Sequence, residues 1–202
     1  MASNSTPFDL MVAPATLYYA PVGEPFPALS ETPSANWKML GTSGAKSYAD
    51  DGVTVRANTS ANLLRTLGTV AVRKATISER GFQVEVLVLD ATAEVMALGF
   101  GLDPEDDITD VAAGAGTVGY RKLELPTSPL PDQFAVLVRA DVSPYMADGK
   151  SQFEITAAIQ TASVEPVYHK TNPFGVRFLW EAIDTDAGFV AYLAQDTVAS
   201  GS

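Results

Sequence analysis

Carboxylates, one histidine and two short motifs are the residues of this chain whose types and spacing could do chemistry. Glu85 and Glu154 each fall on the polar side of a predicted strand, so a carboxylate pair for acid–base hydrolysis can be imagined across a sheet. The distance between the two carboxyl groups decides whether such a pair acts, and the sequence does not fix it. His169 is the only histidine, and the chain has no cysteine and no GxSxG motif. We therefore predict that His169 is a loop residue and belongs to neither a zinc site nor a hydrolase triad.

Two segments resemble ligand-binding motifs. Residues 114–119, GAGTVG, match the GxGxxG dinucleotide fingerprint, but that mechanism needs a strand before the glycines and a helix after them. Here an acidic loop precedes the glycines, and a predicted strand that ends at Pro126 follows them. Residues 103–107, DPEDD, lack the spacing of an EF-hand and favour a solvated acidic loop over a calcium site. We expect no enzyme activity, no cofactor and no metal.

The composition indicates a folded, acidic protein. Of 202 residues, 47% are hydrophobic and 18% charged, and the formal net charge is -11. This length fits a single domain with a sizeable core. A protein that grips nucleic acid by its phosphates is usually basic, so that function is disfavoured. No run approaches the ~20 apolar residues of a membrane helix, and the N-terminus lacks a signal-peptide pattern. We expect a protein made in a cytoplasm, with no membrane partner.

The stretch from residue 76 to residue 101 contains the element around which the other elements are arranged. Its first half alternates with the period of a strand, so one face can be buried while the other meets water. Around residues 87–89 both faces become apolar, which predicts that this end is covered on both sides. The apolar face holds Phe82, Val84, Val86 and Val88, and the polar face holds Gln83 and Glu85.

The second half of the same stretch predicts a helix over 91–98. Good helix formers replace the alternating pattern there. Asp90 is the expected N-cap, because its carboxylate can accept a hydrogen bond from the first turn. Gly99 is the expected left-handed C-cap. The helix would pack on the sheet that the preceding strand belongs to.

The rest of the chain predicts short strands separated by turns. Together with the central strand they number about seven or eight, which favours a mainly β sandwich or barrel with one flanking helix. We expect one domain over 1–202, with an N-terminal arm at 1–13, a C-terminal arm at 187–202 and a short helix near 189–193. The other predicted strands are 15–20, 52–58, 117–125, 134–140, 153–159 and 174–180.

Five motifs occur in an order that covers most of the chain. They are ATLYYAPVG at 15–23, NWKMLGTS at 36–43, DDGVTVRAN at 50–58, LVLDATAEVMALGFG at 87–101 and GVRFLWEAI at 175–183. In this order they resemble the major tail tube protein of long-tailed, siphovirus-type bacteriophages. Each motif is weak alone, and the ordered set is more specific. Members of that family often carry Glu near position 90 and a more Leu-rich helix after it, so the likeness is at family level.

The resemblance implies a β-sandwich whose copies form hexameric rings that stack into a hollow tail. Strands of neighbouring copies would join into a barrel that lines the channel, and the arms and the loop at 21–33 would bridge copies. The partners would be other copies and the tail terminator, tape measure and baseplate proteins. The location would be the tail of the virion, assembled in the host cytoplasm, with DNA passing through the bore without specific binding.

The polar sides of the strands are the predicted lining of that bore. Acidic walls would keep phosphates off the surface, whereas basic walls would hold them. The alternative is that these side chains lie on the outside of a ring. The predicted lumen-facing residues are Gln83, Glu85, Glu154, Thr156, Arg177 and Glu181.

A second function class is a glycan- or receptor-binding β-sandwich of a phage baseplate or a bacterial surface. Such a protein would need aromatic side chains along an exposed groove. The candidates Trp37, Tyr145, Tyr168 and Trp180 are scattered along the chain, and Trp180 alternates with core-like residues. We therefore rank this class below the tube-forming subunit.

Overall fold

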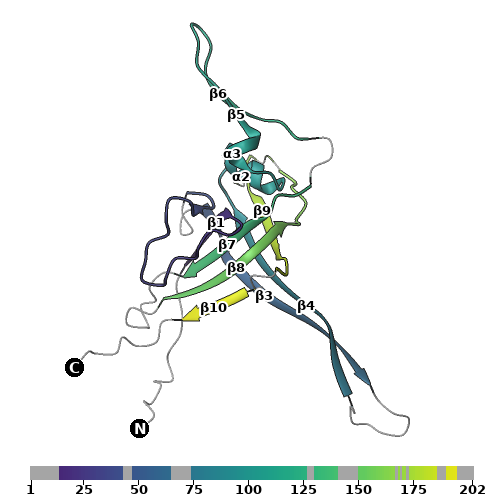
Figure 1. Cartoon of the computed structure of the whole chain (residues 1–202). Helices are drawn as coiled ribbons and strands as arrows, with labels where there is room; N and C mark the ends of the chain where they lie inside the picture. The colour runs from purple at the N-terminus through teal and green to yellow at the C-terminus, as the bar shows by residue number, and fades with distance from the viewer. Residues whose placement is uncertain are drawn as a thin grey trace, which may run out of the picture.

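The computed structural model describes residues 14–42, 47–64, 74–126, 130–140, 150–166, 168, 170–171, 173–185 and 190–194. Within these ranges the protein is mainly β, as predicted: one large antiparallel sheet, one two-stranded sheet and two short helices (Figure 1). None of the described helices has the length and apolar character needed to cross a membrane. The expected arm at 1–13 lies outside the described residues, and so does His169.

The large sheet has the strand order β2-β1-β7-β8-β9-β4-β3, and β10 also pairs with β8. Its strands are β1 Ala15–Pro21, β2 Lys38–Met39, β3 Tyr48–Leu64, β4 Lys74–Val88, β7 Phe134–Ala140, β8 Ser151–Gln160, β9 Val176–Ala182 and β10 Val190–Ala194. The small sheet pairs β5 Ile108–Val111 with β6 Tyr120–Leu123. The helices are α2 Ala93–Gly99 and α3 Pro104–Asp107.

The large sheet bends around one apolar core. The alternation predicted for β4 is confirmed, since Val84, Val86 and Val88 are at most 1% exposed. Phe178 and Trp180 of β9 join the same cluster. Alternating apolar side chains on neighbouring strands thus share one buried face, as a half-buried sheet requires.

A tyrosine connects the two ends of the bent sheet. The hydroxyl of Tyr48, at the start of β3, accepts a hydrogen bond from Leu17 N of β1 (3.1 Å) and donates one to Leu40 O (2.9 Å). Burial raises the pKa of Tyr48 well above its usual value, so the phenol stays protonated and keeps its donor. In the described part of the chain β2 and β3 do not pair. The sheet is therefore rolled but not closed by hydrogen bonds.

Helix α2 begins two residues later than predicted. Thr92 is the N-cap, and its hydroxyl accepts a hydrogen bond from Val95 N at 3.3 Å. The Asp90 carboxylate instead accepts two hydrogen bonds from Thr42, from the backbone amide at 2.7 Å and from the hydroxyl at 2.6 Å. The prediction of Asp90 as the cap was wrong because a long-range partner, invisible in the local sequence, takes its carboxylate.

The predicted C-cap was also wrong. Gly99 is the last residue of α2, and the residue in the left-handed region is Gly101, with φ of 74°. Gly99 is small for a different reason: a Cβ there would lie 2.8 Å from Val176 Cγ1 on β9. The glycine lets the helix approach the sheet closely.

Three further expectations fail locally. Leu87 is 38% exposed, so the end of β4 is covered on one face only. Residues 190–194 form β10 rather than a short helix, with Tyr192 opposite Phe153, and the rest of the expected C-terminal arm, 187–189 and 195–202, lies outside the described residues. The acidic segment 103–107 is a capped turn of helix, α3, because Asp103 accepts from Glu105 N at 2.9 Å.

A loop covers part of the outer face of the sheet, the face opposite the core. Residues 22–37 pack there against β1 and β7, where Ala20, Trp37, Ala135 and Leu137 form a second buried cluster. Trp37 Nε1 donates to Pro25 O at 2.9 Å, which fixes the proline-rich loop over the sheet. The part of the same face on β4, β9 and β3 has no such cover among the described residues.

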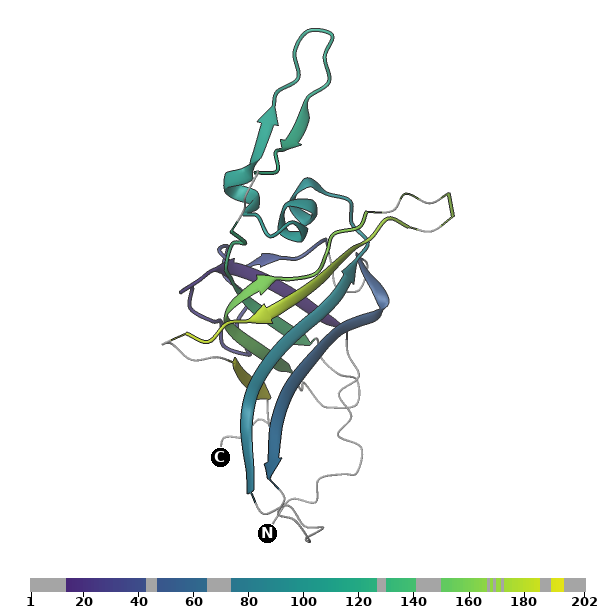
Figure 2. The ribbon, with the colours of Figure 1, turned by 90° about the vertical axis from the view of Figure 1, so that its right-hand side faces the viewer.

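Two antiparallel ribbons project from opposite ends of the molecule (Figures 1 and 2). One is the far end of β3–β4, which continues past the last pair between β4 and β9 at Gln83. A register shift between Ser60 and Ala61 marks a β-bulge in it, because Ser60 pairs with Glu79 while Ala61 pairs with Ile77. The other is the β5–β6 hairpin, which extends from α2 and α3.

Candidate functional site

The outer face of β3, β4 and β9 holds four of the six residues predicted to line a bore. At its centre the Glu85 side chain is only 16% exposed and forms ion pairs with Arg177 of β9 and, at 2.5 Å, with Arg56 of β3. These two guanidinium groups, Arg177 first, hold the pKa of Glu85 below its ordinary value of 4.5. Glu85 therefore stays charged and ties three strands together.

Gln83 and Glu181 lie next to that cluster. They are register partners on β4 and β9, and the Gln83 side chain accepts a hydrogen bond from Asn58 Nδ2 of β3 at 3.1 Å. The sheet thus brings together Gln83, Glu85, Arg177 and Glu181, which the sequence analysis had grouped by alternation alone.

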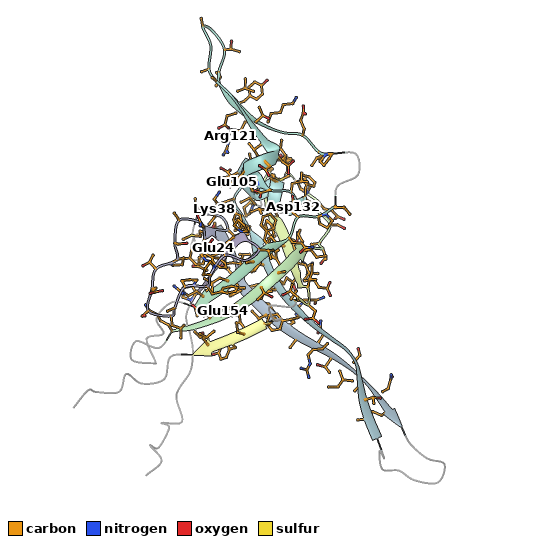
Figure 3. All side chains as sticks on the ribbon, viewed as in Figure 1. Glu24, Lys38, Glu105, Arg121, Asp132 and Glu154 are labelled. Atoms are coloured by element: carbon orange, nitrogen blue, oxygen red, sulfur yellow. The ribbon has the colours of Figure 1, made fainter. Side chains whose placement is uncertain are left out.

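Glu154 and Thr156 are not part of this group, because they lie on β8. Gln152 Nε2 donates to Glu154 Oε1 at 2.5 Å, and the Gln152 oxygen accepts from Arg139 at 2.6 Å. Arg139 in turn donates to Glu31 O at 2.5 Å and to Ala28 O at 3.0 Å. Figure 3 shows Glu154 on β8, far from α3 and the base of the β5–β6 hairpin, where Glu105 and Arg121 lie. Glu154 therefore belongs to the contact that fastens the 22–37 loop.

Thr156 has a partner of its own. Its hydroxyl lies 3.3 Å from the hydroxyl of Thr185, within hydrogen-bond distance. It follows Ile155, where the pairing of β8 with β7 shifts register: Val136 pairs with Ile155, but Phe134 pairs with Ala158. The bulge ends the simple alternation that had been used to group Thr156 with the others.

The uncovered face carries charges of both signs rather than acidic groups alone. Its described residues include two arginines, Arg56 and Arg177, and two glutamates, Glu85 and Glu181. Arg56, Glu85 and Arg177 line an open hollow of about 520 Å³, together with Asp51 and Leu87. Ion pairs engage Glu85 with Arg56 and Arg177, so these three residues offer a passing phosphate neither a free cationic cluster nor a strong acidic field.

The far end of the β3–β4 ribbon carries an apolar face that sequence reasoning missed. Cross-strand pairs Ala61–Ile77 and Leu63–Ala75 share one side, and all four residues are exposed, Leu63 at 53% and Ile77 at 57%. On the other side the pair Asn62–Thr76 is polar. The alternation is visible in the sequence only after the two segments are paired through the bulge.

This ribbon also has an unpaired edge. Among the described strands β3 has β4 on one side and no strand on the other. From the pair Asn58–Gly81 to the pair Leu64–Lys74 no third strand supports it. Isolated two-stranded ribbons are marginally stable in water, and open edges pair readily with other chains.

The motifs with a possible ligand have structural roles. Residues 114–119 form the tip of the β5–β6 hairpin, where Gly114 and Thr117 exchange two backbone hydrogen bonds of 3.1 and 3.0 Å. Asp107 accepts from Asp103 N at 3.1 Å in α3. In the described ranges no three His, Asp or Glu residues are grouped so that they could hold a metal ion.

In the part of the chain that the structure describes, the aromatic side chains do not form an exposed groove of the kind a glycan-binding site needs. Trp37 is 4% exposed and Trp180 is fully buried. Tyr168 is 84% exposed and contacts only Phe174 among the described aromatic rings. Tyr145 lies outside the described residues.

Comparison with known proteins adds no assignment. No protein-family model matches the chain, and a search of curated proteins gives no significant match.

Proposed function

We propose that this protein is a structural, non-catalytic subunit of a bacteriophage tail tube. Its copies form hexameric rings, and the rings stack into a conduit through which DNA passes. The partners are other copies and the tail terminator, tape measure and baseplate proteins, and the location is the virion tail. The number six and these heterologous partners come from the resemblance described above.

The observation that carries the proposal is the far end of the β3–β4 ribbon. It combines an unpaired strand edge with an exposed apolar face that includes Leu63 and Ile77. Nothing among the described residues covers either feature. A closed ring of copies would use up such edges, and stacking of the rings would bury such faces.

The uncovered face of β3, β4 and β9 is our candidate for the lining of the bore. Gln83, Glu85, Arg177 and Glu181 lie on it, and the ion pairs of Glu85 leave it without a cluster of free cations. DNA could slide past such a face, because sequence-independent binding needs Lys or Arg that are free to neutralise phosphates. Glu154 and Thr156 become weaker candidates, because Glu154 takes part in fastening the 22–37 loop.

The test of assembly is direct. The purified full chain, concentrated at neutral pH, should elute as a species larger than a monomer by light scattering and should form rings or tubes in negative-stain micrographs. A compact monomer at every concentration would overturn the proposal.

The test of the bore uses Glu181→Lys. Glu85→Lys is a poor probe, since it would place a third cation between Arg56 and Arg177 and weaken the fold itself. Glu181→Lys leaves those ion pairs intact, so particles should assemble normally and release DNA more slowly. Unchanged DNA release from particles with the variant would remove Glu181 from the lining, and Glu165→Lys, the same charge change at another exposed position, is the matched control.

A further inference from the structure

Ion pairs and close backbone contacts hold the β5–β6 hairpin in a fixed position. At its base Arg121 forms ion pairs with Asp110 across the hairpin and with Glu94 of α2. Near its tip Gly119 is in close backbone contact, since a Cβ there would lie 2.9 Å from Ala113 N and 3.0 Å from Val111 O. The hairpin is therefore held at a defined angle to the body (Figure 3).

The outer end of one side of this hairpin carries exposed apolar residues, while Lys122 makes the base of that side polar. Val111 pairs with Tyr120, and this pair shares a side with the pair Thr109–Lys122. Tyr120 is 57% exposed, and Val118, just before it, is 86% exposed. Single exposed apolar residues are normal on protein surfaces, but apolar side chains gathered on one projecting element indicate an interaction site.

The two uncovered apolar ribbons of the molecule cannot cover each other within one copy. The β5–β6 hairpin and the far β3–β4 ribbon project from opposite ends in both views (Figures 1 and 2). A second copy in the same orientation, displaced along that direction, brings one ribbon to the other. Such a contact is heterologous, because it joins two different surfaces of the chain. When it is repeated from copy to copy, it builds an open-ended stack.

The local absence of acidic groups permits another copy as the occupant despite the net charge. The chain has a formal net charge of -11, so copies repel one another in general. No carboxylate is among the exposed apolar side chains, which are Val118 and Tyr120 on the hairpin and Ala61, Leu63, Ala75 and Ile77 on the far ribbon, and the charged residue on the side of Tyr120 is Lys122. The two sides can therefore meet without burying an acidic group, which would be costly.

We propose that the apolar outer end of the β5–β6 hairpin of one copy docks on the apolar side of the far β3–β4 ribbon of the next copy in the stack. This inference rests on the proposed function, because it assigns the contact between successive rings. It identifies the residues of the contact between rings, which the ring arrangement alone does not specify.

The absence of cysteine makes the contact testable by disulfide trapping. Val118→Cys protein with one affinity tag is mixed with Ile77→Cys protein with another, assembled, and mildly oxidised. We expect a disulfide-linked pair that carries both tags. The matched control replaces Val118→Cys with Val22→Cys, which is 48% exposed on the 22–37 loop and should give no more mixed pairs than random collision.

A second variant measures the contact without oxidation. Val118→Asp/Tyr120→Asp should raise the concentration needed for tube growth by more than about tenfold, since a buried charge in an apolar contact costs at least that factor. Circular dichroism should show an unchanged fold, because both positions are exposed. Tubes of the double variant that grow at the wild-type concentration would overturn the inference.

The outcomes separate this inference from the proposed function. Tubes that form without the mixed disulfide would overturn the inference and leave the function standing. The mixed disulfide in a sample without rings or tubes would keep the contact and overturn the function. Neither tubes nor mixed disulfide would overturn both.

Discussion

The two halves of the β3–β4 hairpin follow one alternating pattern and meet opposite surroundings. Near the body Val84, Val86 and Val88 are at most 1% exposed. At the far end Leu63 and Ile77, on the apolar side of the same two strands, are more than half exposed. The pattern of residue types is the same, so the difference lies in what packs on it. The near half packs against the rest of its own chain, and the far half has no cover among the described residues.

The largest expected effect is a loss of stability from a change in the buried half of the β3–β4 hairpin, near the body. Val86→Asp would bury an unpaired carboxylate in the core, which costs at least about 4 kcal/mol, much of the stability of an ordinary domain. We expect little soluble protein and no cooperative urea transition. Ile77→Asp is the matched change in the far half and should melt like the wild type. Equal losses in both variants would mean that the far ribbon is packed within the monomer.

The next effect is a loss of stability from removing the Tyr48 hydrogen bonds, which connect the two ends of the bent sheet and lie away from the far ribbon. Tyr48→Phe removes the hydroxyl that bonds Leu17 N and Leu40 O, both buried, and should cost about 1–3 kcal/mol of unfolding free energy. Urea denaturation followed by tryptophan fluorescence measures the loss. Tyr120→Phe, an exposed tyrosine, serves as the control and should be neutral. A neutral Tyr48→Phe would show that apolar packing alone holds the roll.

A smaller effect concerns the ion pairs of the uncovered face and depends on pH. The folded pKa of Glu85 lies below its ordinary value of 4.5. Its contribution to stability is therefore present above about pH 4.5 and is lost as the pH falls through the lowered pKa. Glu85→Gln should cost about 1 kcal/mol or less at pH 7 and should flatten the acid limb of the stability profile. Glu181→Gln is the charge-matched control, and an acid limb unchanged in Glu85→Gln would contradict the assignment.

The smallest expected effect on monomer stability comes from a change in the far half of the hairpin, and it separates stability from assembly. Leu63→Ser should change the unfolding free energy of the dispersed chain by less than about 0.5 kcal/mol, as for most surface substitutions. The same variant should weaken assembly, because the removed side chain belongs to the apolar face. Parallel calorimetry and light scattering measure the two quantities. A loss of stability without a loss of assembly would contradict the proposal that the apolar face of the far ribbon contacts another copy.

Local patterns predicted the elements whose environment is set by period alone. The alternation of β4 and β9 and the apolar core that they build follow from side chains pointing to alternate faces. The helix was predicted within two residues. Its caps were not, because Thr42 takes the Asp90 carboxylate and Val176 leaves no room for a Cβ at Gly99. Both causes lie far away in the chain.

The candidate site was predictable in part for the same reason. Gln83, Glu85, Arg177 and Glu181 share a face because β4 and β9 alternate without interruption where they pair. Glu154 could not be assigned, since the 22–37 loop that reaches it is distant in sequence. The far ribbon was missed because its apolar face depends on pairing two segments across a bulge, and no local pattern reports a bulge.

The bulge in the far ribbon has a genetic consequence. Between the pairs Ser60–Glu79 and Ala61–Ile77, β4 has one residue more than β3, namely Ser78. Side chains alternate along a strand, so this extra residue is what places odd-numbered Ile77 and Ala75 on the same side as even-numbered Phe82 and Val84. Loss of the single Ser78 codon would therefore remove the local bend and leave the pairs Ala61–Ile77 and Leu63–Ala75, and with them the apolar side, unchanged.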